Sequence, residues 1–132
     1  MNTVLNLGSA ILLGASSPVT AGDLEQYQWK NRLVLVFADS QTDEKLRKQI
    51  DFLAAGQAEL SERDIVIIQN TEPDDTSDMR KRFNPTGFLF VLIGKDGSAK
   101  LKSTTPIEIS DLTGLIDTMP MRLQEMGDQN QN

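Results

Sequence analysis

The sequence contains no cysteine and no histidine among its 132 residues. It can form no disulfide, and it has no thiolate or imidazole to act as a nucleophile or base. Zinc and haem sites with the usual nitrogen and sulfur ligands are excluded, as is a Ser-His-Asp triad. Thiol oxidoreductase and peroxidase activities are excluded too. Any catalysis would depend on carboxylates, Lys, Tyr27, Ser, Thr or an oxygen-bound metal, and we expect neither a cofactor nor a metal.

Basic residues are also few. Lys and Arg number 13 against 19 Asp and Glu, a formal net charge of -6. Nucleic acids and anionic membrane surfaces favour proteins with a basic patch, so we expect neither as a partner. The length and the 39% hydrophobic content fit one globular domain with a real core.

The N-terminus predicts an export signal. An apolar segment, Val4–Ala15, precedes a stretch of small residues that ends at Ala21. Val19 and Ala21 form an A-x-A-like cleavage site, so the mature chain is predicted to start at Gly22 and to be periplasmic or secreted. No Lys or Arg precedes the apolar segment. The alternative is an N-terminal arm on a cytoplasmic domain, because the segment is too short and polar for a transmembrane helix.

Alternating apolar runs and helical patterns predict an α/β fold with the order β-α-β-α-β-β-α. The run Leu33–Ala38 is continuous and rich in β-branched residues, which is typical of a strand buried on both faces. The predicted strands cover residues 31–38, 64–69, 88–93 and 98–103. The predicted helices cover residues 40 or 42 to about 62, 77–83 and 110–119, with one more turn over 121–126 and a polar tail over 127–132.

Several local signals refine this outline. Gly94-Lys-Asp-Gly97 predicts a hairpin turn, and Asn84 predicts a left-handed end to the helix before it. Ser40 or Thr42 is expected to cap the first long helix. Lys100 and Lys102 alternate with apolar residues, as in an edge strand, and Lys95 is expected to be a surface charge; these lysines favour solubility and edge protection.

The order of elements is that of the thioredoxin fold. Residues 23–38, 92–101 and 116–126, with the motifs Trp29-Lys-Asn-Arg32 and Met119-Pro-Met-Arg122, resemble an uncharacterised bacterial family that is known only as a domain of unknown function. Similar domains occur in sushi-repeat extracellular matrix proteins, for which a peroxiredoxin-like fold has been proposed. The resemblance implies a three-layer α/β/α sandwich with a mixed four-stranded sheet over residues 22–126.

The sequence departs from working thioredoxins and peroxiredoxins at the redox site. Those enzymes place a cysteine where the first strand meets the first helix, and this chain has Ser40-Gln-Thr-Asp43 there. Active thioredoxins also carry a cis-proline directly before the third strand. Phe88 or Leu89 occupies that position here, because Pro85 lies too early. The prediction is a retained fold without thiol chemistry.

The junction of the first strand and helix is the predicted ligand site. Its backbone N–H groups and hydroxyls could bind an anion or a peptide, or could serve only as a helix cap. Trp29 is expected to be a partly buried packing residue, with ligand stacking as the alternative. Arg32 and Arg122 either pair with Asp39 or Asp43 or are surface charges. The candidate ligand-binding residues are Asp39, Ser40, Gln41, Thr42, Asp43, Trp29, Arg32 and Arg122.

Two further groups of residues are weighed as metal sites. Residues 72–78 are rich in carboxylates, but they lack the spacing of calcium loops, so a solvated loop with a helix cap is favoured. Met119, Met121 and Met126, with Met79 elsewhere, could bind Cu(I), but methionine as flexible packing is favoured.

The sequence therefore predicts an exported thioredoxin-like domain that acts as a non-catalytic binding or accessory module with a protein or peptide partner. One alternative is a non-cysteine enzyme that uses Asp39, Ser40 or Asp43 in acid and base roles. Another is a structural domain that self-associates through a sheet edge or its Met-rich end.

Overall fold

The computed structural model describes residues 24–130. The predicted signal over 1–21 and the predicted mature start at Gly22 lie outside these residues. None of the described helices is long and apolar enough to cross a membrane.

The centre of the fold is a mixed four-stranded sheet, as predicted. Its strands are β1 (Arg32–Phe37), β2 (Ile65–Asn70), β3 (Leu89–Ile93) and β4 (Ala99–Ser103). Their order across the sheet is β2-β1-β3-β4. β1 runs parallel to β2 and antiparallel to β3, and β3 runs antiparallel to β4. The Gly94–Gly97 turn joins β3 to β4 with a 2.9 Å bond from Gly97 N–H to Gly94 O.

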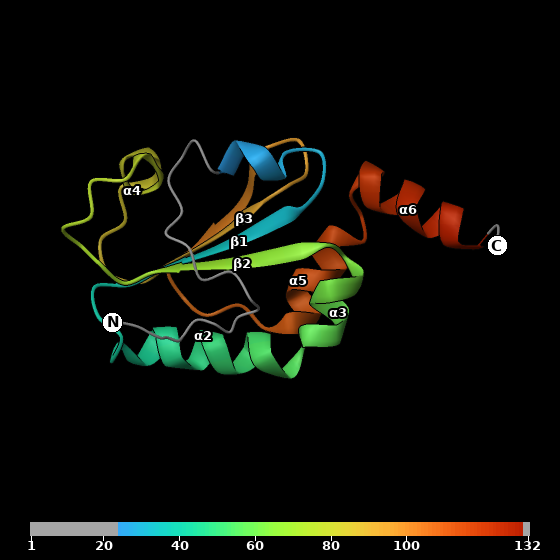
Figure 1. Cartoon of the computed structure of the whole chain (residues 1–132). Helices are drawn as coiled ribbons and strands as arrows, with labels where there is room; N and C mark the ends of the chain where they lie inside the picture. The colour runs from blue at the N-terminus through green and yellow to red at the C-terminus, as the bar shows by residue number, and fades with distance from the viewer. Residues whose placement is uncertain (1–23, 131–132) are drawn as a thin grey trace.

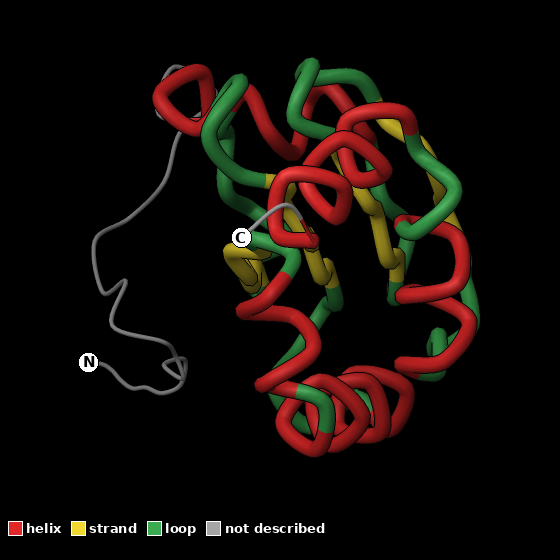
Figure 2. The backbone as a smooth tube through the Cα atoms, turned by 90° about the vertical axis from the view of Figure 1, so that its right-hand side faces the viewer, coloured by secondary structure: helices red, strands yellow, loops and turns green. Residues whose placement is uncertain are grey.

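Helices cover both faces of the sheet, which confirms the α/β/α arrangement. Figure 1 shows α2, α3 and α5 on one face, and α4 with a short 3₁₀ helix, η2, on the other; Figure 2 shows the strands between these groups. The helices are η2 (Glu25–Tyr27), α2 (Glu44–Ala55), α3 (Gln57–Glu62), α4 (Asp78–Phe83), α5 (Ile109–Ile116) and α6 (Pro120–Asn130). Asn84 closes α4 with φ 45°, the predicted left-handed conformation.

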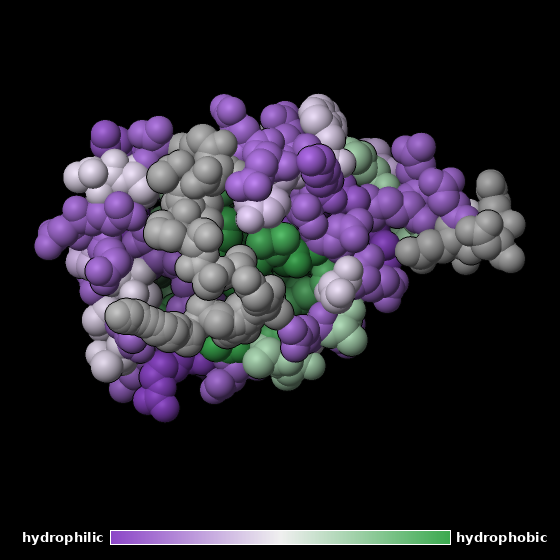
Figure 3. All heavy atoms as spheres, viewed as in Figure 1, coloured by the Kyte–Doolittle hydropathy of each residue, from purple (hydrophilic) through white to green (hydrophobic). Residues whose placement is uncertain are grey.

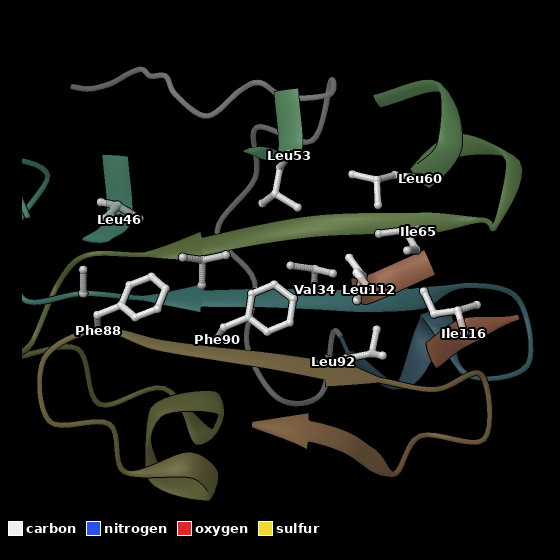
Figure 4. Close-up of a cluster of buried hydrophobic side chains, with 12 residues drawn as sticks. Val34, Leu46, Leu53, Leu60, Ile65, Phe88, Phe90, Leu92, Leu112 and Ile116 are labelled. Atoms are coloured by element: carbon white, nitrogen blue, oxygen red, sulfur yellow. The ribbon is translucent and has the colours of Figure 1, made fainter. Parts of the chain in front are cut away.

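β1 divides the apolar core in two, because its side chains alternate between the faces. Val34 and Val36 pack with residues of α2, α3 and α5, the cluster drawn in Figure 4. Leu33, Leu35 and Phe37 pack on the opposite face with Met79 and others. All six residues of β1 are buried; the continuous apolar run predicted this for Leu33–Phe37, and Arg32 is buried as well.

The single long helix predicted after β1 is two helices. Gly56 separates α2 from α3, and the start of α5 packs against it. A Cβ atom at position 56 would lie 2.5 Å from Cγ1 of Ile109, so the close approach of Ile109 requires glycine there. Leu46, Leu53 and Leu60 of these two helices are buried, whereas Ala54 is exposed.

The C-terminal helix is longer than the single turn expected over 121–126. α6 begins at Pro120, whose missing N–H costs nothing in the first turn, and continues to Asn130. It therefore includes residues 127–130, for which the sequence predicted a tail. The helix projects from the body of the molecule (Figure 1).

Candidate functional site

The predicted ligand site is a short exposed turn that starts α2. Ser40 Oγ lies 3.0 Å from Thr42 Oγ1 and accepts a 3.3 Å hydrogen bond from the Thr42 N–H. The carboxylate of Asp43 accepts a 2.9 Å bond from the Leu46 N–H. Asp43 is therefore the N-cap, and the expectation that Ser40 or Thr42 caps the helix is wrong. A carboxylate is favourable as the N-cap because its negative charge also interacts with the positive end of the helix dipole.

Within the described residues, the hydrogen bonds of Ser40 include no base. Ser40 is hydrogen-bonded to a neighbouring threonine rather than to a base, so its hydroxyl is not activated. The residue directly before β3 is Phe88, which is buried, where a thioredoxin would carry its proline. Asp39, Ser40, Gln41 and Thr42 are exposed and lie together at the carboxyl end of β1.

Arg80 completes this end of the sheet and was not anticipated from the sequence. Its guanidinium donates to Asn70 Oδ1 at 2.8 Å and to the main-chain oxygens of Ala38 and Asn70 at 2.9 and 3.1 Å. It also stacks 5.5 Å from the centre of the Phe37 ring. The buried arginine thus ties together the carboxyl ends of β1 and β2. No sequence motif marks it, because its partners are mostly backbone atoms.

The acidic loop after β2 is a hydrogen-bonded turn, in line with the predicted solvated loop. Asp75 accepts bonds from the Asn70 side chain at 2.7 Å and the Ser77 N–H at 3.1 Å. Burial opposes its ionisation, but these bonds and the charge of Arg80 lower the pKa of the Asp75 carboxyl. Ser77 caps α4. The described residues contain no group of three acidic side chains placed to hold a metal.

Trp29 lies on the surface, so the expectation of a partly buried packing residue is wrong. Its side chain is 62% exposed. Its backbone is left-handed, with φ 70°, and its N–H donates to Lys95 O at 2.6 Å. A left-handed conformation is costly for a bulky residue. The turn from η2 into β1 imposes it, and the large ring then projects outward.

An open pocket of about 290 Å³ lies between η2 and the turn that joins β3 to β4. Its polar lining includes Gln28, Asn31, Arg82 and Asp96. The Gln28 amide donates to Asp96 O at 2.9 Å, and Arg82 donates to Gly97 O at 3.2 Å. Gln28 and Arg82 are thus already hydrogen-bonded to other residues that line this pocket.

Arg32 and Arg122 lie at the opposite end of the sheet from Asp39 and Asp43. Both side chains are 1% exposed. The expectation that they pair with Asp39 or Asp43, or are surface charges, is wrong. Arg32 begins β1, whereas Asp39 follows its end, so the length of the strand separates them.

Glu125 on α6 is the centre of this buried charge cluster. Its two oxygens accept bonds from Arg32 at 3.2 Å each, and Lys95 Nζ lies 2.7 Å away. Lys95 also contacts Asp64 at 2.8 Å and is 8% exposed, so it is not the surface charge expected. Burial opposes the ionisation of Glu125, but the bonds from Lys95 and Arg32 prevail and lower the pKa of its carboxyl.

Asp117, at the end of α5, and Arg122, on α6, extend the cluster. Arg122 contacts Asp117 at 3.1 Å and Glu62 at 2.8 Å, and Arg63 contacts Asp117 at 2.9 Å. The bonds from Arg63 lower the pKa of the Asp117 carboxyl. Burial opposes the charge of Arg122, but its acidic partners raise its pKa. The cluster contains four cations and four anions, so it fastens α6 and leaves no net charge for a ligand.

Two of the four methionines weighed as copper ligands pack against the core. Met79, on α4, is 1% exposed, and Met119 packs against the core cluster on the other face of the sheet. The sheet therefore separates these two sulfur atoms, and packing stays the prediction for Met121 and Met126.

Comparison with protein-family models identifies the family of this chain. A family model described as "Domain of unknown function (DUF4174)" matches residues 23–125. The chain belongs to the DUF4174 family. Comparison with curated protein sequences finds no match.

Solved structures of redox proteins share the fold of this DUF4174 domain. Reduced 2-Cys peroxiredoxin of Plasmodium vivax aligns at 15% identity over 80% of this chain and 84% of its own, with a TM-score of 0.56. Chloroplastic thioredoxin z aligns at 16% identity over 76% of this chain and 89% of its own, with a TM-score of 0.58. Thioredoxin peroxidase I of Plasmodium yoelii aligns at 13% identity over 80% of this chain and 79% of its own, with a TM-score of 0.54. At these identities the likeness concerns the fold alone.

Proposed function

We propose that this DUF4174 domain is exported and acts as a binding or accessory module for a protein or peptide, without thiol chemistry. One observation carries the proposal. In a thioredoxin-like fold, the turn from β1 into α2 holds Asp43 as a helix cap, with no cysteine anywhere in the sequence. The same observation gives no support to the alternative of a carboxylate or hydroxyl enzyme, because the Asp43 carboxylate already serves the helix.

Export rests on the signal-like pattern of residues 1–21 and on the resemblance to sushi-repeat extracellular proteins. The test is the mass of the protein recovered from the periplasm and medium of an expressing cell. We expect a chain that begins at Gly22. An intact chain found only in the cytoplasm would contradict export.

The absence of thiol chemistry is tested in disulfide-reductase and peroxidase assays, with a cysteine-containing thioredoxin as the positive control. We expect no turnover above the protein-free rate. Measurable turnover by the cysteine-free protein would overturn the proposal.

Binding is tested by crosslinking in the exported fraction, followed by purification and mass spectrometry. We expect a partner at a fixed stoichiometry, and weaker capture by Trp29→Ala, because an exposed indole supplies apolar contact area at low entropic cost. Recovery of the domain alone under every condition would contradict a binding role.

A further inference from the structure

The two edges of the sheet differ in how they are protected. β4 forms one edge; it exposes Lys100 and Lys102, and its pairing with β3 shifts register between Leu92 and Ile93. Lysines and irregular pairing are the usual devices that prevent another strand from adding to an edge. The lysines and the irregular pairing therefore oppose the addition of a further strand at the β4 edge.

β2 forms the other edge and has none of these devices. Its sequence is Ile65-Val-Ile-Ile-Gln-Asn70, without charge or proline. Val66 packs partly against one core cluster and Ile67 against the other, and both stay half-buried. Figure 3 shows apolar residues gathered at the level of β2 on the face turned to the viewer. A regular apolar edge of this kind is a template for strand addition.

The register shows which backbone groups point away from the sheet. Arg32 N–H donates to Asp64 O, and Ala38 N–H donates to Asn70 O. Because β1 and β2 are parallel, the even-numbered residues of β2 face β1, and Ile65, Ile67 and Gln69 direct their N–H and C=O groups outward. Within the described residues, no backbone bond to these outward groups from another element is present.

Acidic side chains flank this edge at both ends. At the start of β2, Glu59 is the exposed acidic side chain outside the charge cluster; Glu62 and Asp64 are 52% and 50% exposed, but Arg122 and Lys95 balance their charges. After the strand come exposed carboxylates in the loop over 72–75. A second copy of β2, parallel or antiparallel, would bring acidic ends against acidic ends. The charge pattern therefore disfavours self-pairing and favours a basic partner.

We propose that the outer edge of β2 binds an extended segment of another protein, an apolar strand flanked by Lys or Arg, which adds to the sheet as a fifth strand. Outward N–H and C=O groups supply affinity, and the acidic flanks select the basic ends. The inference rests on the proposed binding function and assigns the site and the partner's chemistry.

The probe is a labelled peptide, acetyl-Lys-Lys-Thr-Val-Thr-Val-Thr-Lys-Lys-amide, added to the full chain. We expect saturable binding by anisotropy. Replacing its four lysines by glutamate should abolish binding. Two further peptides are N-methylated at alternate residues, one at the odd positions and one at the even positions. Only one of them should lose binding, because a strand presents one set of N–H groups to its neighbour.

Hydrogen exchange locates the contact. We expect the amides of Ile65, Ile67 and Gln69 to exchange fast in the free chain and to slow when the peptide binds. Slow exchange at all concentrations in the free chain would mean that the chain's own residues cover the edge. Slowing that depends on protein concentration, with a dimer in sedimentation, would mean that a second copy covers it. Either result overturns the proposal.

Ile67→Pro removes an outward N–H without breaking a bond to β1, so it should weaken peptide binding by about tenfold or more. Gln69→Pro also removes an outward N–H, nearer the end of the strand. It serves as the test variant if Ile67→Pro does not fold. Glu72→Gln should weaken binding of the lysine peptide, whereas Asp111→Asn, an exposed neutralisation on α5, should not. Unchanged binding in both proline variants overturns the site.

The experiments distinguish failure of the β2 site from failure of the proposed binding function. If Ile67→Pro captures the exported partner as well as the wild type does, the binding function stands and the β2 site falls. If the wild type captures no partner and binds no peptide, the proposed function falls with it.

Discussion

A single carboxylate, Asp43, decides where α2 begins. Its Oδ1 accepts the Leu46 N–H at 2.9 Å, whereas the Ser40 and Thr42 hydroxyls bond to each other. Asp43→Ala should lower the free energy of unfolding by about 1 kcal/mol, the usual value of an N-cap. Urea denaturation measures it.

Ser40→Ala is the matched control, and it should change stability by no more than about 0.5 kcal/mol, as exposed substitutions do. A larger loss in Ser40→Ala than in Asp43→Ala would mean that serine is the true cap.

Trp29 combines exposure with an unfavourable backbone. Glycine adopts φ 70° without the cost of about 1–2 kcal/mol that other residues incur, although it also gains entropy in the unfolded chain. Trp29→Gly should therefore leave the free energy of unfolding unchanged or raise it by up to about 1 kcal/mol. Thermal and urea melts test this. A loss above about 1 kcal/mol would show that the ring contributes to packing after all.

At the scale of elements, the junction of α2 and α3 depends on Gly56. An added methyl group would lie 2.5–2.8 Å from three side-chain atoms of Ile109, so α5 would have to shift. Gly56→Ala should cost about 1–3 kcal/mol, the usual penalty of overpacking. The measurement is the free energy of unfolding from urea denaturation.

Two variants separate this clash from the general effect of replacing glycine. Gly114→Ala in α5, where nothing lies within 4 Å, should stabilise by about 0.5–1 kcal/mol. In the background Ile109→Ala, Gly56→Ala should cost much less than in the wild type. Equal costs in both backgrounds would contradict the packing argument.

Strands and short helices were predictable because their signals are local. β1, the hairpin turn and the cap at Asn84 follow from apolar runs and turn residues. The break at Gly56 was not predictable, since it depends on a contact with Ile109, which is distant in sequence. The length of α6 also escaped prediction, because long-range ion pairs rather than an apolar stripe fasten it.

At the scale of the whole molecule, the sequence predicted the absence of thiol chemistry but misplaced the charges. The absence of cysteine is a property of composition and needs no structure. Arg32, Lys95 and Arg122 carried no such signal. Their partners lie between 3 and 93 residues away in the chain. Only the position of α6 near the start of β1 brings these charges together, so a charged residue in the sequence does not reveal whether it is buried.

The charge cluster also contributes to how stability depends on pH. The pKa values of the Glu125 and Asp117 carboxyls lie below their ordinary values of 4.5 and 3.8 in the folded protein. The unfolded chain therefore binds more protons in this range, and the stabilisation is lost as pH falls from about 4.5 through the folded pKa values. With no histidine or cysteine in the sequence, the free energy of unfolding should stay level from about pH 6 to 8.

Urea denaturation at a series of pH values tests this with two variants. Glu125→Gln should be destabilised at pH 7, because Arg32 and Lys95 lose their shared carboxylate, and its stability should fall less steeply below pH 4.5. Asp111→Asn, which removes an exposed carboxylate on α5, should keep the wild-type slope. If Glu125→Gln keeps that slope as well, proton uptake elsewhere drives acid unfolding and the cluster does not. If its slope is shallower, proton uptake by the cluster that fastens α6 contributes to acid unfolding.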